Sequence, residues 1–238
     1  MQSRYTHKDG TPFTKEEFIQ KLKTDKEFND EFGNKGIDQI SDLIKQLKEN
    51  PDSRRILLSA WNPSDLPKQV LPPCHYGFQV YTRELSIKER FDLWEKLPNR
   101  DVMDFPIGEL TEEQYHEVLN DLGVKKRAIS LMYNARSQDV PLGTPFNLAS
   151  YGLLLMILAK EVNMVPDELI SNMGDCHIYL NQIDGVKEQL TREPFELPTL
   201  NQFPTYEGTR PSIESYVVSD FTLENYQSHP AIKMPLSN

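Results

Sequence analysis

The stretch that decides the fold is RAISLMYNARS at residues 127–137, followed closely by PFNLASYGLLLMILAKEV at residues 145–162. The first segment is short and apolar and has the character of a β-strand. The second segment is apolar on almost all sides, as a long buried central helix would be. Together they predict an α/β (α+β) fold in which a mixed β-sheet is packed by helices.

Further strands and helices surround this pair. RRILLSAWNP at residues 54–63 and CHYGFQVYTR at residues 74–83 are predicted as buried strands, and ELISNMGDCHIYLNQI at residues 168–183 as another strand or a tight turn. The charged segment 14–32 is predicted to be helical. A second helix is predicted over residues 37–50, where apolar residues from Ile37 onward recur at helical spacing and Pro51 stops the helix.

Residues 84–127 differ from the rest and are interpreted as a helical insertion between two strands. SIKERFDLWEKL at residues 86–97 and TEEQYHEVLNDLG at residues 111–123 have the pattern of two surface helices. The second begins with a capping box, Thr111 to Gln114, and ends near a glycine. The block is too short and too poor in apolar residues to be a separate domain.

Composition limits the function classes. The chain has 238 residues, with 36 acidic against 26 basic side chains and a net charge of −10, which argues against a DNA-binding protein. Two cysteines cannot build a disulfide scaffold, and their spacing fits no zinc pattern, so no metal is expected. The longest apolar run, residues 151–159, is far shorter than the roughly 20 residues of a membrane span. The polar N-terminal stretch lacks a signal peptide, so we expect a cytoplasmic protein that does not contact membranes.

Several polar residues are candidates for chemistry, each with a plainer alternative. Cys74 and His75 are neighbours on a predicted strand, and neighbours on a strand point to opposite faces, so they are not expected to form a catalytic pair. Arg54, Arg55 and Arg136, the last beside Ser137, suit a phosphate, although a solvated surface pair is the plainer interpretation of Arg54 and Arg55. Asn147 can read a ring edge with one donor and one acceptor, or can simply cap a helix.

Taken in order, the motifs resemble the thymidylate synthase family. The resemblance is carried by PDSRR (51–55), LPPCH (71–75), ARSQDVPLGTPFNLASY (135–151), GDCHIYLNQI (174–183), LTREPFELPTL (190–200) and HPAIKMP (229–235). It implies a thymidylate-synthase-like catalytic domain over residues 37–238, interrupted by the insertion at 84–127. Residues 1–36 are then a divergent or truncated N-terminal segment, and the N-terminal portion of the family pattern is expected to be missing.

The resemblance implies a reaction and a nucleophile. The enzyme would be a methyltransferase that converts dUMP to dTMP by reductive methylation, with methylene-tetrahydrofolate as cosubstrate and no metal. Cys74 would add to C6 of the uracil ring and form a covalent adduct. Arg136 and Ser137 would bind the phosphate. Arg54 and Arg55 would reach the site of the partner subunit, which implies a homodimer formed through the sheet.

The remaining site residues follow from the same resemblance. Asn147 would favour uracil over cytosine, and His177 and Tyr179 would hold the deoxyribose hydroxyl. The folate would contact an aspartate and a glycine. Two further residues would lie behind Cys74, the predicted nucleophile, and support it. These are Asp139 and Gly143 for the folate, and His75 and Gln79 behind the nucleophile.

The chain also departs from the family pattern. Ala135 stands where the family usually has glutamine, and Gln138, Pro141 and Thr144 are unusual as well. The family's catalytic glutamate and its N-terminal arginine loop have no counterpart in residues 1–36. Two alternatives therefore stay open, a dUMP hydroxymethylase and a truncated or degenerate nucleotide-binding paralogue without catalysis.

Overall fold

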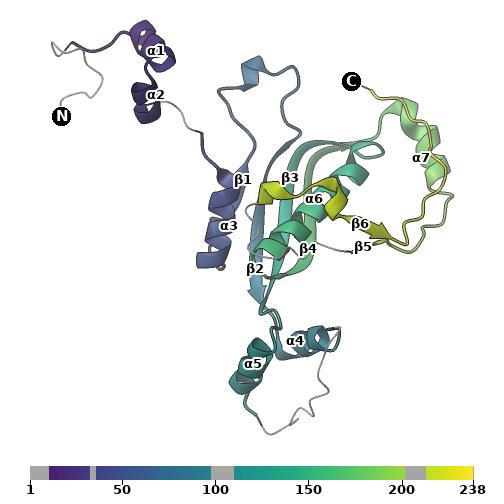
Figure 1. The fold of residues 1–238 in the computed structure, drawn as a ribbon. Coiled ribbons are helices and arrows are strands. Elements are labelled where there is room, and N and C mark those ends of the chain that lie inside the picture. The colour runs from purple at the N-terminus through teal and green to yellow at the C-terminus, as the bar shows by residue number, and fades with distance from the viewer. Residues whose placement is uncertain (1–10, 33–35, 98–109, 202–212, 238) are drawn as a thin grey trace. The chain divides into compact units, whose positions relative to one another are not determined.

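The computed structural model describes residues 11–32, 36–97, 110–201 and 213–237. Figure 1 shows its helices and strands. The chain divides into two units, Met1–Gln39 and Ile40–Asn238, which are described separately.

The first unit contains two short helices where the sequence predicts helical structure. Helix α1 spans Lys15–Thr24 and helix α2 spans Lys26–Phe32. Asp25 separates them, because its backbone N–H closes α1 while its carboxylate accepts a hydrogen bond from the backbone N–H of Phe28 at 3.0 Å. The same carboxylate pairs with Lys21, which lowers the pKa of Asp25.

The second unit is built on a four-stranded mixed sheet, as the sequence predicts. Its strands are β1 (Leu57–Ser59), β2 (His75–Glu84), β3 (Arg127–Asp139) and β4 (Val165–His177), in the order β1-β2-β3-β4. The first two neighbouring pairs are antiparallel, and β3 pairs with β4 in parallel. Helix α6 (Gly143–Glu161) makes the crossover that a parallel pair requires. These elements confirm the α/β class.

One face of the sheet carries the core. Alternate residues of β2 and β3, among them Phe78 and Leu131, pack with buried side chains of α3 (Gln39–Glu49) and α6. Figure 1 shows α6 lying across this sheet. The helix is buried only in its C-terminal half, where Leu158 is 0% exposed, whereas Phe146 in its first turns is 75% exposed. In the single chain, α6 is therefore not the fully buried central helix that its composition predicts.

Two predicted elements are shorter than expected. The strand predicted over residues 54–63 reduces to the three residues of β1, and Leu57 in it is 55% exposed, so the expectation of a buried strand is wrong. Ile56, directly before β1, belongs to the core, and the half-buried Leu58 packs against it. Helix α3 begins at Gln39, and Ile37 is 80% exposed, so Ile37 does not anchor the helix. In both segments, the apolar pattern of the sequence includes residues, Leu57 and Ile37, that the structure leaves exposed.

Two helices lie between β2 and β3, as the sequence predicts. They are α4 (Ile87–Trp94) and α5 (Glu112–Asp121), and the predicted capping box of α5 is present. Gly123 follows α5 with a φ of 73°, a conformation that favours glycine at the end of a helix. Residues 98–109 of the predicted insertion lie outside the described residues.

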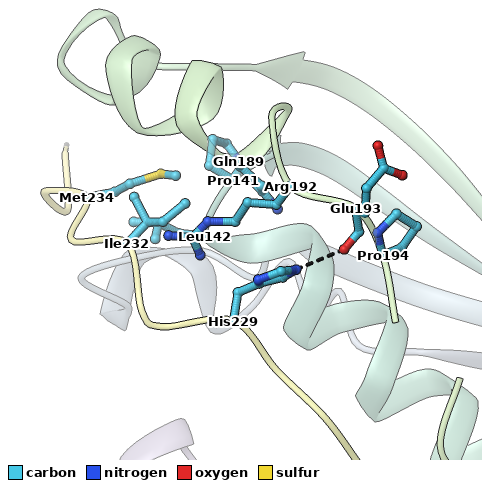
Figure 2. Close-up of a pocket in the computed structure, with 9 residues that line it drawn as sticks. All are labelled: Pro141, Leu142, Gln189, Arg192, Glu193, Pro194, His229, Ile232 and Met234. Carbon is cyan, nitrogen blue, oxygen red and sulfur yellow. Dashed lines mark hydrogen bonds between the residues drawn. The ribbon is translucent and has the colours of Figure 1, made fainter. Parts of the chain in front are cut away.

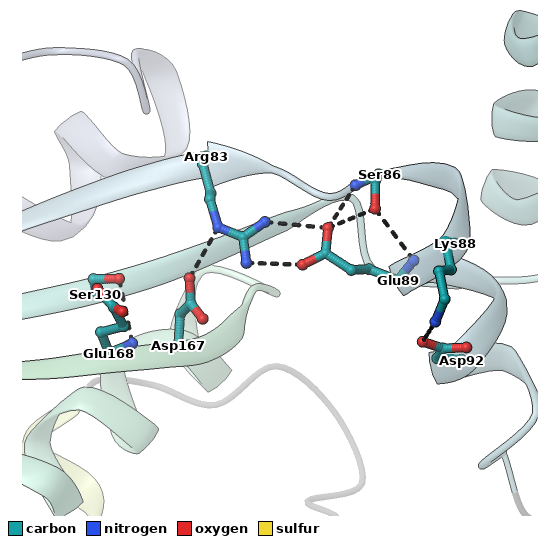
Figure 3. Close-up of polar contacts among 8 residues, drawn as sticks. All are labelled: Arg83, Ser86, Lys88, Glu89, Asp92, Ser130, Asp167 and Glu168. Carbon is teal, nitrogen blue, oxygen red and sulfur yellow. Dashed lines mark hydrogen bonds and ion pairs between the residues drawn. The ribbon is translucent and has the colours of Figure 1, made fainter.

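An arginine joins the first of these helices, α4, to the sheet (Figure 3). Arg83 of β2 donates to Asp167 of β4 at 3.0 Å and to both carboxylate oxygens of Glu89 of α4, at 2.8 and 3.2 Å. These hydrogen bonds lower the pKa of Glu89 to about 2, with Arg83 as the main cause. The start of the insertion is thus fixed to two strands at once.

The C-terminal part of the chain passes along α7. After β4 come the short helix η2 (Leu180–Gln182) and α7 (Ile183–Gln189). Strands β5 (Thr199–Asn201) and β6 (Thr222–Glu224) form a second, two-stranded sheet. An irregular segment follows β6. In the part of the chain that the structure describes, no helix is long and apolar enough to cross a membrane.

A pair of glycines gives a stability prediction. A Cβ at Gly77 of β2 would lie 2.5 Å from the backbone oxygen of Leu58, whereas a Cβ at Gly152 of α6 would meet Leu169 at an ordinary 3.9 Å. We expect Gly77→Ala to lower the free energy of unfolding by about 2–3 kcal/mol and Gly152→Ala to raise it by up to about 1 kcal/mol. Urea unfolding checks both, and equal midpoints for the two variants would contradict the close approach of β1 and β2.

Candidate active site

Cys74 lies in the bend that leads into β2, one residue before the strand begins. The prediction that places it on the strand is therefore wrong, because the two prolines ahead of it delay the start of the strand. Its thiol is half-buried and free. The argument that Cys74 and His75 point to opposite faces of a strand does not apply here.

Arg136 of β3 is bound to the loop that carries Cys74. Its backbone N–H donates to the carbonyl oxygen of Cys74 at 2.8 Å. Its guanidinium donates to the carbonyl oxygens of Pro73 at 2.9 Å and Pro72 at 2.8 Å. These three hydrogen bonds hold the nucleophile loop and the exposed arginine together, and Ser137 follows Arg136 on the same strand.

Arg54 and Arg55 are not brought to Cys74 within the chain. The carbonyl of Ile56, the next residue, accepts from the backbone N–H of Val80 at 3.1 Å. Val80 is six residues beyond Cys74, or about 20 Å along an extended strand. Both arginines are exposed. One subunit therefore cannot place them on the same ligand as Arg136.

Gln79 is likewise remote from the nucleophile in this chain. It pairs with Leu57 of β1 and Met132 of β3, on the face of the sheet opposite to the core. The resemblance places it close behind Cys74, whereas it lies five residues along β2. It lines a cavity of about 400 Å³ on that uncovered face, together with Tyr81 and Ile170.

His75 packs against a pair of tyrosines. Its ring centroid lies 5.6 Å from that of Tyr133 and 5.4 Å from that of Tyr151, and the two tyrosines stack at 4.3 Å with parallel rings. Burial lowers the pKa of His75 and raises the pKa of Tyr151. His75 thus serves as a packed, neutral residue directly after the nucleophile.

This burial predicts a pH dependence of stability. The folded protein resists protonation of His75, while the unfolded chain takes up that proton near pH 6.5. Stability is therefore fully present above about pH 6.5 and declines as the pH falls below it. We expect the urea midpoint to drop less between pH 7.5 and 5.5 in His75→Gln than in the unmodified protein. The same drop in both proteins would contradict this assignment.

The junction between β3 and α6 gathers the predicted base-reading and folate residues. The side-chain Nδ2 of Asn147 donates to Oε1 of Gln138 at 3.2 Å, so Asn147 does not cap the helix. Asp139 accepts from the backbone N–H of Leu142 at 3.1 Å. A Cβ at Gly143 would lie 3.0 Å from Nε2 of Gln138, so a larger residue would crowd this junction.

The predicted sugar-binding residues lie beside the same junction. His177 pairs with Asp139 across β3 and β4, and its ring contacts that of Tyr179 at 4.9 Å, edge to face. Nδ1 of His177 is buried without a hydrogen-bond partner among the described residues, with Oδ1 of Asp175 3.5 Å away. Within the single chain, the sheet therefore brings Cys74, Arg136, Ser137, Asp139, Gly143, Asn147, His177 and Tyr179 to its one end.

Sequence reasoning missed Gln182, which is 0% exposed. Its Nε2 donates to Oδ2 of Asp139 and to the carbonyl oxygen of Pro235, both at 3.2 Å, and its Oε1 accepts from the backbone N–H of Tyr179 at 3.2 Å. It therefore connects Asp139, the predicted folate residue, with Tyr179, a predicted sugar residue, and with the C-terminal segment. The one available signal was a polar residue in the otherwise recognisable motif at 174–183.

A cleft of about 470 Å³ adjoins this junction (Figure 2). Pro141 and Leu142 of the turn between β3 and α6 line it, and Ile232 and Met234 of the C-terminal segment lie in the same lining. His229 hydrogen-bonds the carbonyl oxygen of Glu193 at 2.8 Å and borders the cleft. Among the described residues, no group of three or more histidine, cysteine or acidic side chains could hold a metal.

The geometry defines a class of protein. A half-buried thiol lies on a loop whose backbone is hydrogen-bonded to an exposed arginine, beside a junction where the amides of Asn147 and Gln138 pair, and this arrangement fits an enzyme that uses a cysteine nucleophile on an anionic ligand. Residues 12–108 and 110–238 match the family pattern described as thymidylate synthase. The chain is 37% identical to the thymidylate synthase of Saccharomyces cerevisiae over 210 residues, which cover 88% of this chain and 57% of the yeast protein.

The chain belongs to the thymidylate synthase family. It spans little more than half the length of this curated relative. The family match begins at residue 12 and so includes α1 and α2, where the sequence resemblance was placed only from residue 37 onward.

Proposed function

We propose that this protein is a methyltransferase of the thymidylate synthase type, which converts dUMP to dTMP with methylene-tetrahydrofolate as cosubstrate. The observation that carries the proposal is the attachment of Arg136 to the loop of Cys74 by three hydrogen bonds. These hydrogen bonds hold the half-buried thiol of Cys74 and the guanidinium, a cation, at the same end of the sheet. The same cation is available to a phosphate.

The nucleotide would lie between Cys74 and the β3–α6 junction. Arg136 and Ser137 would bind its phosphate, Asn147 would read O4 and N3–H of uracil, and His177 with Tyr179 would hold the sugar hydroxyl. Nδ1 of His177 is buried and, apart from Oδ1 of Asp175 at 3.5 Å, has no polar partner among the described residues, which leaves it able to bind a ligand. Cys74 would add to C6, so that C5 becomes nucleophilic toward the one-carbon unit.

The residues next to this position fit a folate. Asp139 is half-buried and held in place by Leu142 and Gln182, which suits a carboxylate that accepts hydrogen bonds from a ring. Gly143 and Phe146 are three residues apart and lie on one side of α6, where the exposed phenyl ring offers a flat apolar surface. The folate supplies the one-carbon unit and the hydride, and these residues would bind and orient it.

A homodimer through the uncovered face of the sheet completes the proposal. Leu57, Gln79, Met132 and Ile170 form one row across the four strands on that face. An apolar face of this kind marks a contact with another protein. A partner subunit there would bring its own Arg54 and Arg55 to this site, which the single chain cannot do. Sedimentation of the purified protein tests this, and a monomer at micromolar concentration would contradict it.

The test of the function is direct. The full chain, incubated with dUMP and methylene-tetrahydrofolate, should form dTMP together with an equal amount of dihydrofolate, which is followed by its absorbance. Release of 5-hydroxymethyl-dUMP without dihydrofolate would identify the hydroxymethylase instead. Binding of dUMP without either product would contradict catalysis by this chain.

The sequence also leads us to propose that the protein is cytoplasmic.

A further inference from the structure

We propose that Gln138 is a positioning residue that sets base selectivity by fixing the side-chain amide of Asn147. The inference rests on the proposed function and extends it to a residue that would not itself need to touch the nucleotide. Gln138 is the penultimate residue of β3, and it is 1% exposed.

The side chain of Gln138 is enclosed beneath the start of α6. Its Oε1 accepts the hydrogen bond from Nδ2 of Asn147 at 3.2 Å. Its Nε2 is buried and has no hydrogen-bond partner among the residues that the structure describes. Gly143 leaves the space for it, since a Cβ there would lie 3.0 Å from Nε2. A merely space-filling residue at this position would avoid the cost of an unpaired buried amide.

The hydrogen bond gives Asn147 a preferred orientation. An asparagine amide presents a donor on one side and an acceptor on the other, and rotation by 180° exchanges them. Because Oε1 of Gln138 accepts from Nδ2, rotation of the Asn147 amide alone would set two acceptor oxygens against each other. Asn147 then keeps one N–H and its oxygen for the ligand in a fixed order.

This order matters because the two pyrimidines have opposite patterns. Uracil presents O4 as an acceptor and N3–H as a donor, whereas cytosine presents N4–H as a donor and N3 as an acceptor. An asparagine that rotates freely can match either ring, and one that is held can match only one of them. The contact between Gln138 and Asn147 therefore converts an adaptable amide into a selective one.

The test compares the dissociation constants of dUMP and dCMP, measured calorimetrically on the whole chain of 238 residues. Gln138→Met keeps the volume but removes the acceptor, and Gln138→Asn shortens the amide so that it no longer reaches Asn147. We expect the preference for dUMP over dCMP to fall about five- to tenfold in each, the size of one lost hydrogen bond. Gln138→Glu at pH 8 keeps an acceptor and should keep the preference. Gln20→Met, an exposed position on α1, is the matched control.

The ratio of the two constants is the decisive quantity, because a general loss of packing or phosphate binding weakens both nucleotides equally. An unchanged ratio in a folded Gln138→Met or Gln138→Asn variant would overturn the inference and leave the proposed function intact. A lost preference in Gln138→Glu would overturn it as well. Equal affinity of the unmodified protein for dUMP and dCMP would contradict the proposed function itself, and the inference with it.

Discussion

The Cys74→Ala variant is expected to form no covalent complex with 5-fluoro-dUMP and methylene-tetrahydrofolate, whereas the unmodified protein is expected to form one. The fluorine cannot leave C5 as a proton does, so the bond between the sulfur and C6 persists and is visible by mass spectrometry. Turnover of dUMP should fall below about 10⁻⁴ of the unmodified rate, as is usual when a covalent nucleophile is removed. The structural reason for this expectation is the half-buried thiol, which lies on a loop that is hydrogen-bonded to Arg136.

The second cysteine supplies the matched control. Cys176 is exposed on β4, and its backbone pairs with Gln138, next to the pair formed by Asp139 and His177. Cys176→Ala should keep both the covalent complex and turnover. A covalent complex that survives in Cys74→Ala but disappears in Cys176→Ala would contradict the assignment of the nucleophile.

Arg136→Ala is expected to lower kcat/KM for dUMP by about a hundred- to a thousandfold, because hydrogen bonds to a charged group contribute about 1.5–3 kcal/mol each. Two effects combine in this variant. The phosphate loses its cation, and the carbonyl oxygens of Pro72 and Pro73 lose their donors, so the loop of Cys74 is less well held. Steady-state kinetics with dUMP measure the sum.

Two comparisons separate these effects. Deoxyuridine has no phosphate, so its weak binding should be nearly insensitive to Arg136→Ala if the arginine serves the phosphate. Arg136→Lys keeps the charge but cannot donate to both proline carbonyls in the same fork geometry, and we expect it to recover only part of the activity. Equal losses for dUMP and deoxyuridine would contradict phosphate binding by Arg136.

The sequence predicts elements best where the signal is local. The capping box of Thr111 and the apolar run of β3 depend on residues close in sequence, and both are present. The short β1 and the exposed first turns of α6 were not predictable in this way. Apolar residues there, such as Leu57 and Phe146, lack a partner within the chain, and burial depends on what lies opposite.

In the candidate site, too, the sequence predicts what depends on local motifs and not what depends on the fold. Cys74 and Arg136 were found from short motifs, but their connection through the carbonyl oxygens of two prolines depends on the register of β2 against β3. The roles of Gln138 and Gln182 could not be predicted, because the partners of a buried amide come from segments that only the fold brings together. For Arg54 and Arg55, the motif suggests a site that two subunits share, and a single chain does not form that site.

The amide of Gln182 couples the C-terminal segment to Asp139, a residue of the proposed folate site. Its hydrogen bonds reach Asp139 at one end and Pro235 at the other, and Asn181 exchanges hydrogen bonds with Ser237 nearby. If folate binds Asp139 as proposed, it should therefore steady the last described residues as well. Trimming of this segment by a carboxypeptidase should therefore slow when the site is filled, and a bulky tag fused there would disturb a carboxylate that is distant in sequence.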